Sequence, residues 1–284
     1  MAAPRSWLHP AHGLTLLMDS PAMTDSCPTR NWKLILAYGG AAYHGWQVQP
    51  GLPTVQGALA NAIAHVTGEA VLPQGSGRTD TGVHAEGQVA SFRLDSPIPA
   101  ANLLHALNRA LPPAIRVLSV EAAAADFHAR HSARAKTYQY RIHTAEPCPP
   151  WIAPYVFACN WPLDLDAMQR AAQMVLGEHD FTSFAALDPD LHARGNAAPS
   201  AHPASNVRTI FSSSWQREHN TLIYTVRGSG FLHHMVRNLV GTFIDIGRGR
   251  IAADEVRAIL AAQSRSAAGP TAPANGLFLM HVEY

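Results

Sequence analysis

The hydrophobic positions of this chain switch repeatedly between the two-residue spacing of a strand and the three-to-four-residue spacing of an amphipathic helix. The apolar run KLILAY, residues 33–38, predicts a buried strand. Residues 54–68 come next, and their apolar side chains recur at positions that share one face of a helix. Residues 1–30 lack such periodicity, so we expect a loose leader there and a fold that begins near Trp32.

The first half of this pattern predicts the element order β-α-β-β-α-β. After the helix, the chain offers two extended segments joined by a glycine-rich stretch, then a second helix and a further strand. These segments are AVLPQGSGR (70–78), EGQVASFRL (86–94), NLLHALNRAL (102–111) and AIRVLSVEA (114–122). We therefore expect residues 31–127 to form an N-terminal domain.

The same order recurs with additions in a second half, residues 128–284. Tandem split β-α-β units predict an α+β fold of two ferredoxin-like halves, with antiparallel sheets flanked by helices. The halves are expected to share one sheet or to face each other over a central active-site cleft. A Pro/Ala/Ser-rich stretch, 195–205, is predicted to be a surface loop. The expected elements are strands at 135–143, 154–161 and 276–284, helices at 165–177, 231–247 and 253–263, and a hairpin at 207–228 that turns at His219 and Asn220.

Composition places the chain among ordinary globular proteins. It has 284 residues, of which 47% are hydrophobic and 14% charged, enough to bury the core of one or two domains. Its three cysteines show no paired spacing, so neither a disulfide framework nor a thiolate zinc site is indicated. No apolar run approaches the roughly 20 residues that span a bilayer, so no membrane partner is expected. A cytoplasmic location follows as the expectation.

The overall charge gives little support for a polyanionic partner. The formal net charge is +1, whereas nucleic-acid-binding proteins usually show a clear basic excess. Of the 21 cationic side chains, only Lys33 and Lys136 are lysines. Arginine provides planar, bidentate donors suited to phosphate and carboxylate, although genomic base composition produces the same bias.

The stretch GSGRTDTGVH, residues 75–84, isolates one carboxylate, Asp80, among glycines and threonines. It lacks both the Gly-Lys-Ser/Thr ending of a P-loop and the third glycine of a dinucleotide fingerprint. If the backbone is extended, Arg78 and Asp80 project to the same side. The alternative is a turn in which Asp80 caps backbone N–H groups.

A basic and aromatic stretch, HARHSARAKTYQYR (128–141), has four Lys or Arg residues and no acid. Such interleaving is typical of surfaces that meet phosphate and stack on bases. On a strand, Tyr138 and Tyr140 share one face, and both could belong to the core, which we favour for Tyr140.

A further motif, FLHHMVRN (231–238), is expected near a helix start. Arg237 lies three residues after His234, so the two share a helix face, and the arginine can pair with a carboxylate. The sixteen histidines include no His-Glu-x-x-His, and His233 and His234 are expected to point in different directions on the helix. We therefore expect no metal.

Taken in order, several motifs of this chain resemble the TruA family of tRNA pseudouridine synthases. The resemblance runs from about Trp32 to Tyr284. Thr81 departs from the alanine common in the family, the leader is longer than usual, and the loop at 195–205 is expanded. The motifs are YHGWQ (43–47), GRTDTGVHA (77–85), GQVASF (87–92), NRALP (108–112), DFHARHSARAKTYQYRI (126–142), GEHDFTSF (177–184) and FLHHMVRNLVG (231–241).

The resemblance implies a role for the lone carboxylate. Family members use one aspartate, here Asp80, to detach uracil from ribose, turn it and rejoin it through carbon 5. The aspartate acts as a nucleophile or as a base at the sugar, and because substrate and product are isomers no second acid and no cofactor are needed.

The same resemblance implies roles for further residues. Arg237 would pair with Asp80 and hold it anionic. Tyr138 would stack on the uracil and is a candidate for removing the carbon-5 proton. Arg78 would help to extrude the target nucleotide, or simply tether its loop. The candidates for contacts with the RNA are His84, Arg130 and Arg134; for His84, as for His44, the alternative is a role in orienting loops.

The expected function is that of a tRNA pseudouridine(38-40) synthase, an isomerase that acts on the anticodon stem-loop as a homodimer. A dimer could combine two modest basic clefts, and a positive stripe from Arg78 past Arg130 and Arg134 is expected. Two rivals remain open. A non-catalytic RNA-binding module leaves the Arg-Thr-Asp loop without a role, and an aspartate-dependent hydrolase lacks its partner acid.

Overall fold

The structure is a computed structural model that describes residues 29–186 and 205–284. The expected leader and the expected loop at 195–205 lie outside these residues, except at their ends. Arg30, the last residue of the expected leader, already begins the first strand. Among the described residues, no helix is both long and apolar enough to cross a membrane.

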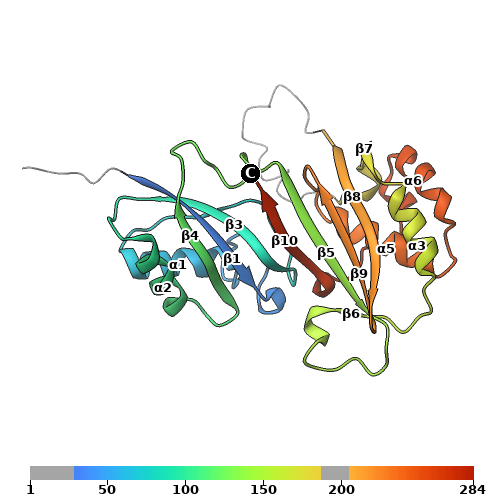
Figure 1. Cartoon of the computed structure of the whole chain (residues 1–284), viewed down its shortest axis with the longest axis horizontal. Helices are drawn as coiled ribbons and strands as arrows, with labels where there is room; N and C mark the ends of the chain where they lie inside the picture. The colour runs from blue at the N-terminus through green and yellow to red at the C-terminus, as the bar shows by residue number, and fades with distance from the viewer. Residues whose placement is uncertain (1–28, 187–204) are drawn as a thin grey trace, which may run out of the picture.

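One sheet of ten strands runs through the described part of the molecule (Figure 1). Its main path follows the order β4-β1-β3-β10-β5-β9-β8-β7, while β2 pairs with β3 and β6 with β5. The strands are β1 Arg30–Tyr38, β2 Gln74–Gly75, β3 His84–Leu94, β4 Ile115–Ala122, β5 Ala135–His143, β6 Phe157–Ala158, β7 Gly177–Asp180, β8 Val207–Glu218, β9 Thr221–Gly228 and β10 Leu277–Glu283.

The last strand, β10, joins the two halves of this sheet. It runs parallel to β3 and antiparallel to β5. Its first three residues, Leu277, Phe278 and Leu279, are buried, so the junction lies within the core. The two groups of strands therefore share one mixed sheet, which is the first of the two arrangements that the sequence left open.

Five α-helices of the described residues flank the sheet, with α1 and α2 beside the first group of strands and α3, α5 and α6 beside the second (Figure 1). Capping fixes the ends of α1: the Thr54 hydroxyl accepts a hydrogen bond from the Gly57 N–H, and Gly68 adopts the left-handed conformation that stops the helix. The helices are α1 Val55–Thr67, α2 Ala100–Ala110, α3 Leu165–Gln173, α5 Met235–Gly247 and α6 Val256–Ala262.

Several expected elements are shorter than the apolar pattern indicated. Of the extended segment expected at 70–78, only β2 pairs. The helix expected at 165–177 ends at Gln173, because the chain turns there and Gly177, at a φ of 94°, begins β7. Of the strand expected at 154–161, only β6 pairs, with a 3₁₀ turn before it. The helix expected from Phe231 begins at Met235, because His234 has a φ of 59° and interrupts helical geometry.

Candidate active site

Two segments far apart in the sequence enclose a pocket of about 190 Å³ at the centre of the sheet. One is the loop that carries Asp80, and the other is the turn that leads into α5. Strand β5 and the start of β10 contribute to its wall. The lining residues are Gly77, Arg78, Thr79, Asp80, Val83, Arg130, Lys136, Tyr138, Phe231, Leu232, His233, His234, Met235, Val236, Arg237 and Leu277.

The carboxylate of Asp80 is held by an arginine from the second half. Arg237 Nη1 donates a hydrogen bond to Asp80 Oδ2 at 2.9 Å, and its Nε donates to the Ala272 carbonyl at 2.8 Å. The two side chains are 15% and 23% exposed, so their attraction is less screened than that of a surface pair. The second hydrogen bond fixes the plane of the guanidinium, which holds the carboxylate in one orientation.

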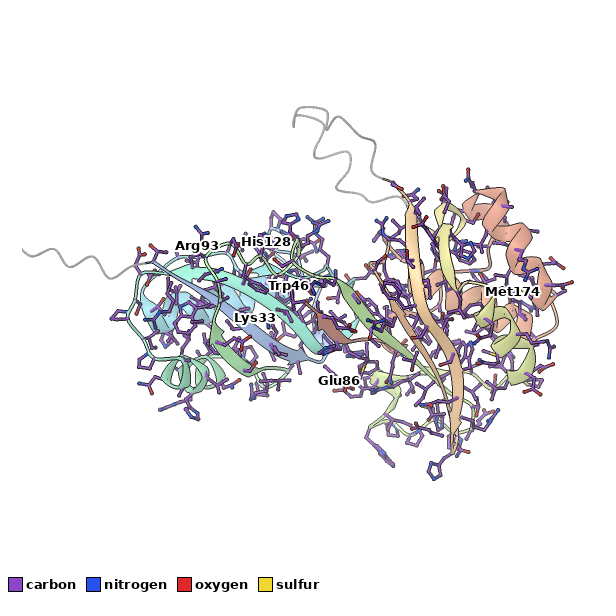
Figure 2. The ribbon with its side chains drawn as sticks, turned by 45° about the horizontal axis from the view of Figure 1, so that its top comes forward. Lys33, Trp46, Glu86, Arg93, His128 and Met174 are labelled. Carbon is purple, nitrogen blue, oxygen red and sulfur yellow. The ribbon has the colours of Figure 1, made fainter. Side chains whose placement is uncertain are left out.

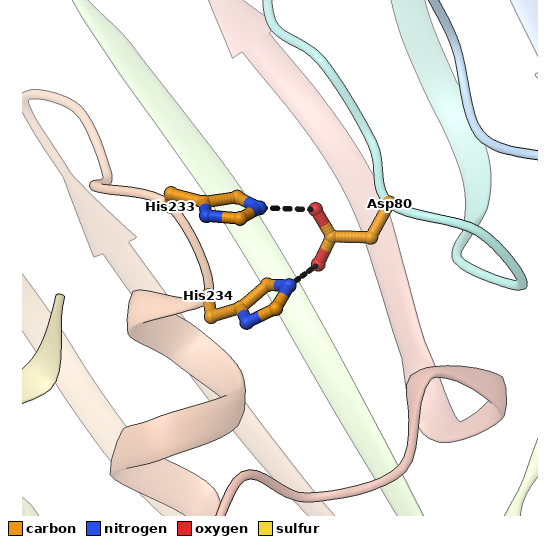
Figure 3. Close-up of side chains that lie close together, drawn as sticks. All are labelled: Asp80, His233 and His234. Atoms are coloured by element: carbon orange, nitrogen blue, oxygen red, sulfur yellow. Dashed lines mark ion pairs between the residues drawn. The ribbon is translucent and has the colours of Figure 1, made fainter. Parts of the chain in front are cut away.

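Two histidines also face this carboxylate, which corrects the expectation that they would diverge. His233 Nε2 lies 3.6 Å from Asp80 Oδ1, and His234 Nε2 lies 3.3 Å from Oδ2 (Figure 3). They precede the helix rather than lying on it, and the left-handed backbone of His234 turns both rings to one side, with centroids 3.9 Å apart. Burial, the largest influence, lowers the pKa of His234, which favours its neutral form.

Buried hydrogen bonds hold the loop that carries Asp80. Gln88 Nε2 donates to the Gly77 carbonyl at 2.9 Å, and its Oε1 accepts from the Ser76 hydroxyl at 2.7 Å. The Tyr38 and Thr79 hydroxyls bond each other at 2.8 Å. Sequence reasoning assigned no role to Gln88, although it lies within the motif GQVASF.

Trp46 closes the space beneath the same loop. Its backbone N–H donates to the Thr79 carbonyl at 3.0 Å, and its ring lies near the centre of the molecule, where the two halves meet (Figure 2). A Cβ atom at Gly75 would come within 2.6 Å of that ring. The absence of a side chain at this position therefore lets the loop approach the core closely.

The two tyrosines of β5 have different surroundings. Tyr138 lines the pocket with its ring against the edge of Phe231, at a centroid distance of 5.0 Å. Burial, with smaller contributions from Tyr38 and Asp80, raises the pKa of Tyr138 and favours its neutral phenol. Tyr140 is fully buried and donates to the Pro273 carbonyl, as expected of a core residue.

Three cationic residues besides Arg237 line the pocket: Arg78, Arg130 and Lys136. Lys136 Nζ donates to the Ser76 carbonyl at 2.6 Å. Burial, together with Arg130 and Arg208, lowers the pKa of Lys136 to about 8. Arg134 is exposed directly before β5 and does not line the pocket, so the structure brings only part of the expected basic group to the site.

His84 does not lie in the pocket, which corrects its assignment as a contact with the substrate. Its side chain is 1% exposed and stacks on Phe278. Its Nδ1 accepts from the Gly40 N–H at 2.9 Å, so Nε2 carries the proton and donates to the Pro154 carbonyl at 3.0 Å. Both ring nitrogens are engaged with backbone, and His84 therefore orients loops, the alternative that the sequence left open.

Comparison with known proteins shows the family of this chain. The model of the tRNA pseudouridine synthase family matches residues 34–132 and 171–284, which include the Asp80 loop and the α5 turn. The chain belongs to the tRNA pseudouridine synthase family and is an isomerase. The segment 133–170, which contains Tyr138, falls between the two matched regions.

Individual relatives match over most of their length. A tRNA pseudouridine synthase A of Solibacter usitatus is 51% identical over 255 residues, covering 90% of this chain and 100% of the relative. The protein of the same name from Acetivibrio thermocellus is 42% identical with the same coverage. The tRNA pseudouridine synthase A of Halalkalibacterium halodurans is 44% identical, and the match covers 86% of this chain and 89% of the relative.

Proposed function

We propose that this protein isomerises uridine to pseudouridine at positions 38, 39 and 40 in the anticodon stem-loop of tRNAs. Family membership supports the reaction. The observation that carries the assignment to a site is the pairing of Asp80 with Arg237 inside a lined pocket. Such a pocket supplies one oriented carboxylate with no second acid among the residues that line it, as an isomerisation requires.

In this proposal Asp80 starts the reaction as an anion. As a nucleophile, the carboxylate bonds to C1′ while the N1–C1′ bond breaks; as a base, it takes a proton from the sugar while that bond breaks. The uracil turns within the pocket and C5 bonds to C1′, as the bond between Asp80 and C1′ breaks or the sugar regains its proton. C5 loses its proton, and N1 gains one. Arg237 orients the carboxylate, and substrate and product contain the same atoms.

Tyr138 provides the surface on which the uracil stacks. Its ring is positioned by Phe231 and forms part of the pocket wall beside Asp80. Because its pKa is raised, the hydroxyl is protonated at neutral pH, which makes the ring a stacking surface first and the phenolate a minor species. Removal of the carbon-5 proton by Tyr138 would need proton transfer in concert with another group.

The cations around the pocket supply interactions that do not depend on base identity. When the target nucleotide leaves its helix, it gives up stacking on its neighbours, and Arg78 compensates by binding the nucleic acid at the pocket. Arg130 and the more distant Arg134 contact the RNA backbone. Recognition by backbone and shape suits one site that acts on neighbouring uridines in differing sequence contexts.

The proposal also includes the domain arrangement, the cellular location and the oligomeric state. The strand order β4-β1-β3-β2 in the first half and β10-β5-β9-β8 in the second supports two ferredoxin-like domains, 31–127 and 128–284. The protein acts in the cytoplasm as a homodimer, which joins two basic clefts into one track and offsets the small net charge.

The position assignment can be tested with stem-loop RNAs that carry tritium at carbon 5 of a single uridine. We expect tritium release with uridine at position 38, 39 or 40, and none when the label lies on the opposite side of the loop. Tight binding without release would contradict the proposal and favour a non-catalytic RNA-binding module. Liberation of free uracil would instead favour a hydrolase.

A further inference from the structure

Asp80, His233 and His234 bring three potential metal ligands together at the proposed active site. One ligand atom from each residue lies within 4.8 Å of the others. The contributing atoms are Nε2 of both imidazoles and the carboxylate oxygens (Figure 3). Two histidines and one carboxylate, with further positions left open, form a ligand set that divalent transition metals accept.

The spacing of these atoms is somewhat wider than that of a closed coordination sphere. Around a tetrahedral ion with bonds of about 2.0–2.1 Å, neighbouring ligand atoms lie about 3.3 Å apart. His233 Nε2 lies 3.6 Å from Oδ1 and His234 Nε2 lies 3.3 Å from Oδ2, and one ligand atom from each residue lies within 4.8 Å of the others. Closure around an ion at Oδ1 therefore requires the side chains to move closer together.

The backbone that places the histidines is unusual, which makes the arrangement specific. His234 holds a left-handed conformation, uncommon for a residue with a side chain, directly before α5. The three side chains are each 23–28% exposed and line the pocket, so a dissolved ion can reach them.

Arg237 limits how tightly an ion can bind. Its guanidinium already contacts Asp80 Oδ2 at 2.9 Å and repels a second cation. Oδ1, on the side of His233, is the oxygen left for coordination. Mg²⁺, which prefers octahedral oxygen ligands, does not suit this set, whereas Zn²⁺ and Co²⁺ do.

We propose that Asp80, His233 and His234 form a binding site for Zn²⁺ or Co²⁺, and that the bound ion inhibits the enzyme by occupying the catalytic carboxylate. The inhibition rests on the proposed function, whereas the binding does not. The ion is an inhibitor and takes no part in the isomerisation.

Binding is tested first with Co²⁺ alone, because a tetrahedral Co²⁺ site absorbs strongly in the visible range. We expect the wild type to show this absorption and to lose it when Zn²⁺ is added. His233→Ala, His234→Ala and Asp80→Asn should each weaken binding by at least about tenfold, since even outer-shell partners contribute that much to metal affinity. Thermal unfolding of each variant checks that it is folded.

A second histidine pair provides the matched control. The rings of His128 and His131 lie 4.3 Å apart, but no described acid groups with them into a metal cluster. The double variant His128→Ala, His131→Ala should bind Co²⁺ as the wild type does. Full absorption in both His233→Ala and His234→Ala, or its loss in the control, overturns the proposed site.

Inhibition is then measured as tritium release from stem-loop RNA. With a chelator present, the wild type should turn over, and equimolar Zn²⁺ should reduce release until the chelator is restored. If Co²⁺ binds but no tritium is released in the presence of the chelator, the proposed function is wrong and the metal site is still supported. If Zn²⁺ leaves the rate of tritium release unchanged, the proposed inhibition is wrong.

Discussion

Two arginine–carboxylate pairs of the molecule have the same chemical groups but different geometry and surroundings. Arg227 and Glu283 form a bidentate pair at the surface, with hydrogen bonds of 2.7 and 2.6 Å that use both carboxylate oxygens. Arg237 gives Asp80 a single bond at 2.9 Å inside the pocket. The surface pair has the better geometry, whereas the carboxylate of the enclosed pair also faces two histidines and lines the pocket.

The surroundings explain the difference. Mutual hydrogen bonding raises the pKa of Arg227 and lowers that of Glu283, but solvent and salt screen an exposed pair. Around Asp80, the loop, α5 and the wall of β5 exclude much of the solvent. The pair at the candidate site is thus distinguished by its enclosure in a pocket rather than by the number of its hydrogen bonds.

The largest effect should come from breaking the enclosed pair. Arg237→Ala removes the cation that pairs with Asp80 and orients it, and we expect the rate of tritium release to fall about 10²- to 10³-fold, as for removal of one key electrostatic contact. Arg227→Ala is the matched control and should leave the rate unchanged. Equal losses in the two variants would refute the comparison.

The second-largest effect should come from weakening the loop that carries Asp80. Gln88→Met leaves the Gly77 carbonyl and the Ser76 hydroxyl without their buried partner, so the free energy of unfolding should fall by about 2–3 kcal/mol. Urea unfolding measures this. The exposed Gln49→Met should be close to neutral, and a neutral Gln88→Met would show that the loop is held by other interactions.

A smaller effect is expected from Tyr138, whose ring forms part of the pocket wall. Tyr138→Ala should weaken stem-loop binding about tenfold, since a base stacked on an aromatic ring contributes about 1–3 kcal/mol. Tyr138→Phe keeps the ring and should bind within about twofold of the wild type. Fluorescence anisotropy measures both. If Tyr138→Phe binds as weakly as Tyr138→Ala, the hydroxyl rather than the ring provides the contact.

The smallest effect should come from Lys136. With its pKa lowered to about 8, this side chain is charged below that pH and neutral above it. Stem-loop affinity should therefore fall severalfold between about pH 7 and about pH 9, as one cation near the RNA is neutralised. Lys136→Met should be weaker at the lower pH and should lack this step, and an unaltered pH dependence in the variant would exclude Lys136 as its source.

Many of the helices and strands could be predicted from the local pattern of apolar and turn residues. The strand expected at 135–143 and the hairpin turn at His219 and Asn220 have their predicted bounds because apolar alternation and turn residues agree there. The pairing of β10 with both β3 and β5 had no local signal, since it depends on contacts between residues far apart in the sequence. Tertiary contacts of this kind decide how two predicted halves join.

Part of the pocket lining could also be predicted from the sequence. Motif resemblance indicated Asp80, Arg237 and Tyr138, and all three line the pocket, while their roles stay predictions. It did not anticipate the approach of His233 and His234 to Asp80, because a helix was assumed where His234 takes a left-handed backbone. It also placed His84 at the substrate, since sequence alone does not reveal that both of its nitrogens bond to backbone.

The central claim is that the Asp80 carboxylate performs the chemistry and is not needed to hold the RNA. Asp80→Asn keeps the size of the side chain and removes its charge, and Asp126→Asn, at an exposed position, is its control. Tritium release and stem-loop affinity should be measured on the same preparations. The account predicts no release and nearly unchanged affinity for Asp80→Asn, with both unchanged for Asp126→Asn; continued release by Asp80→Asn would contradict it.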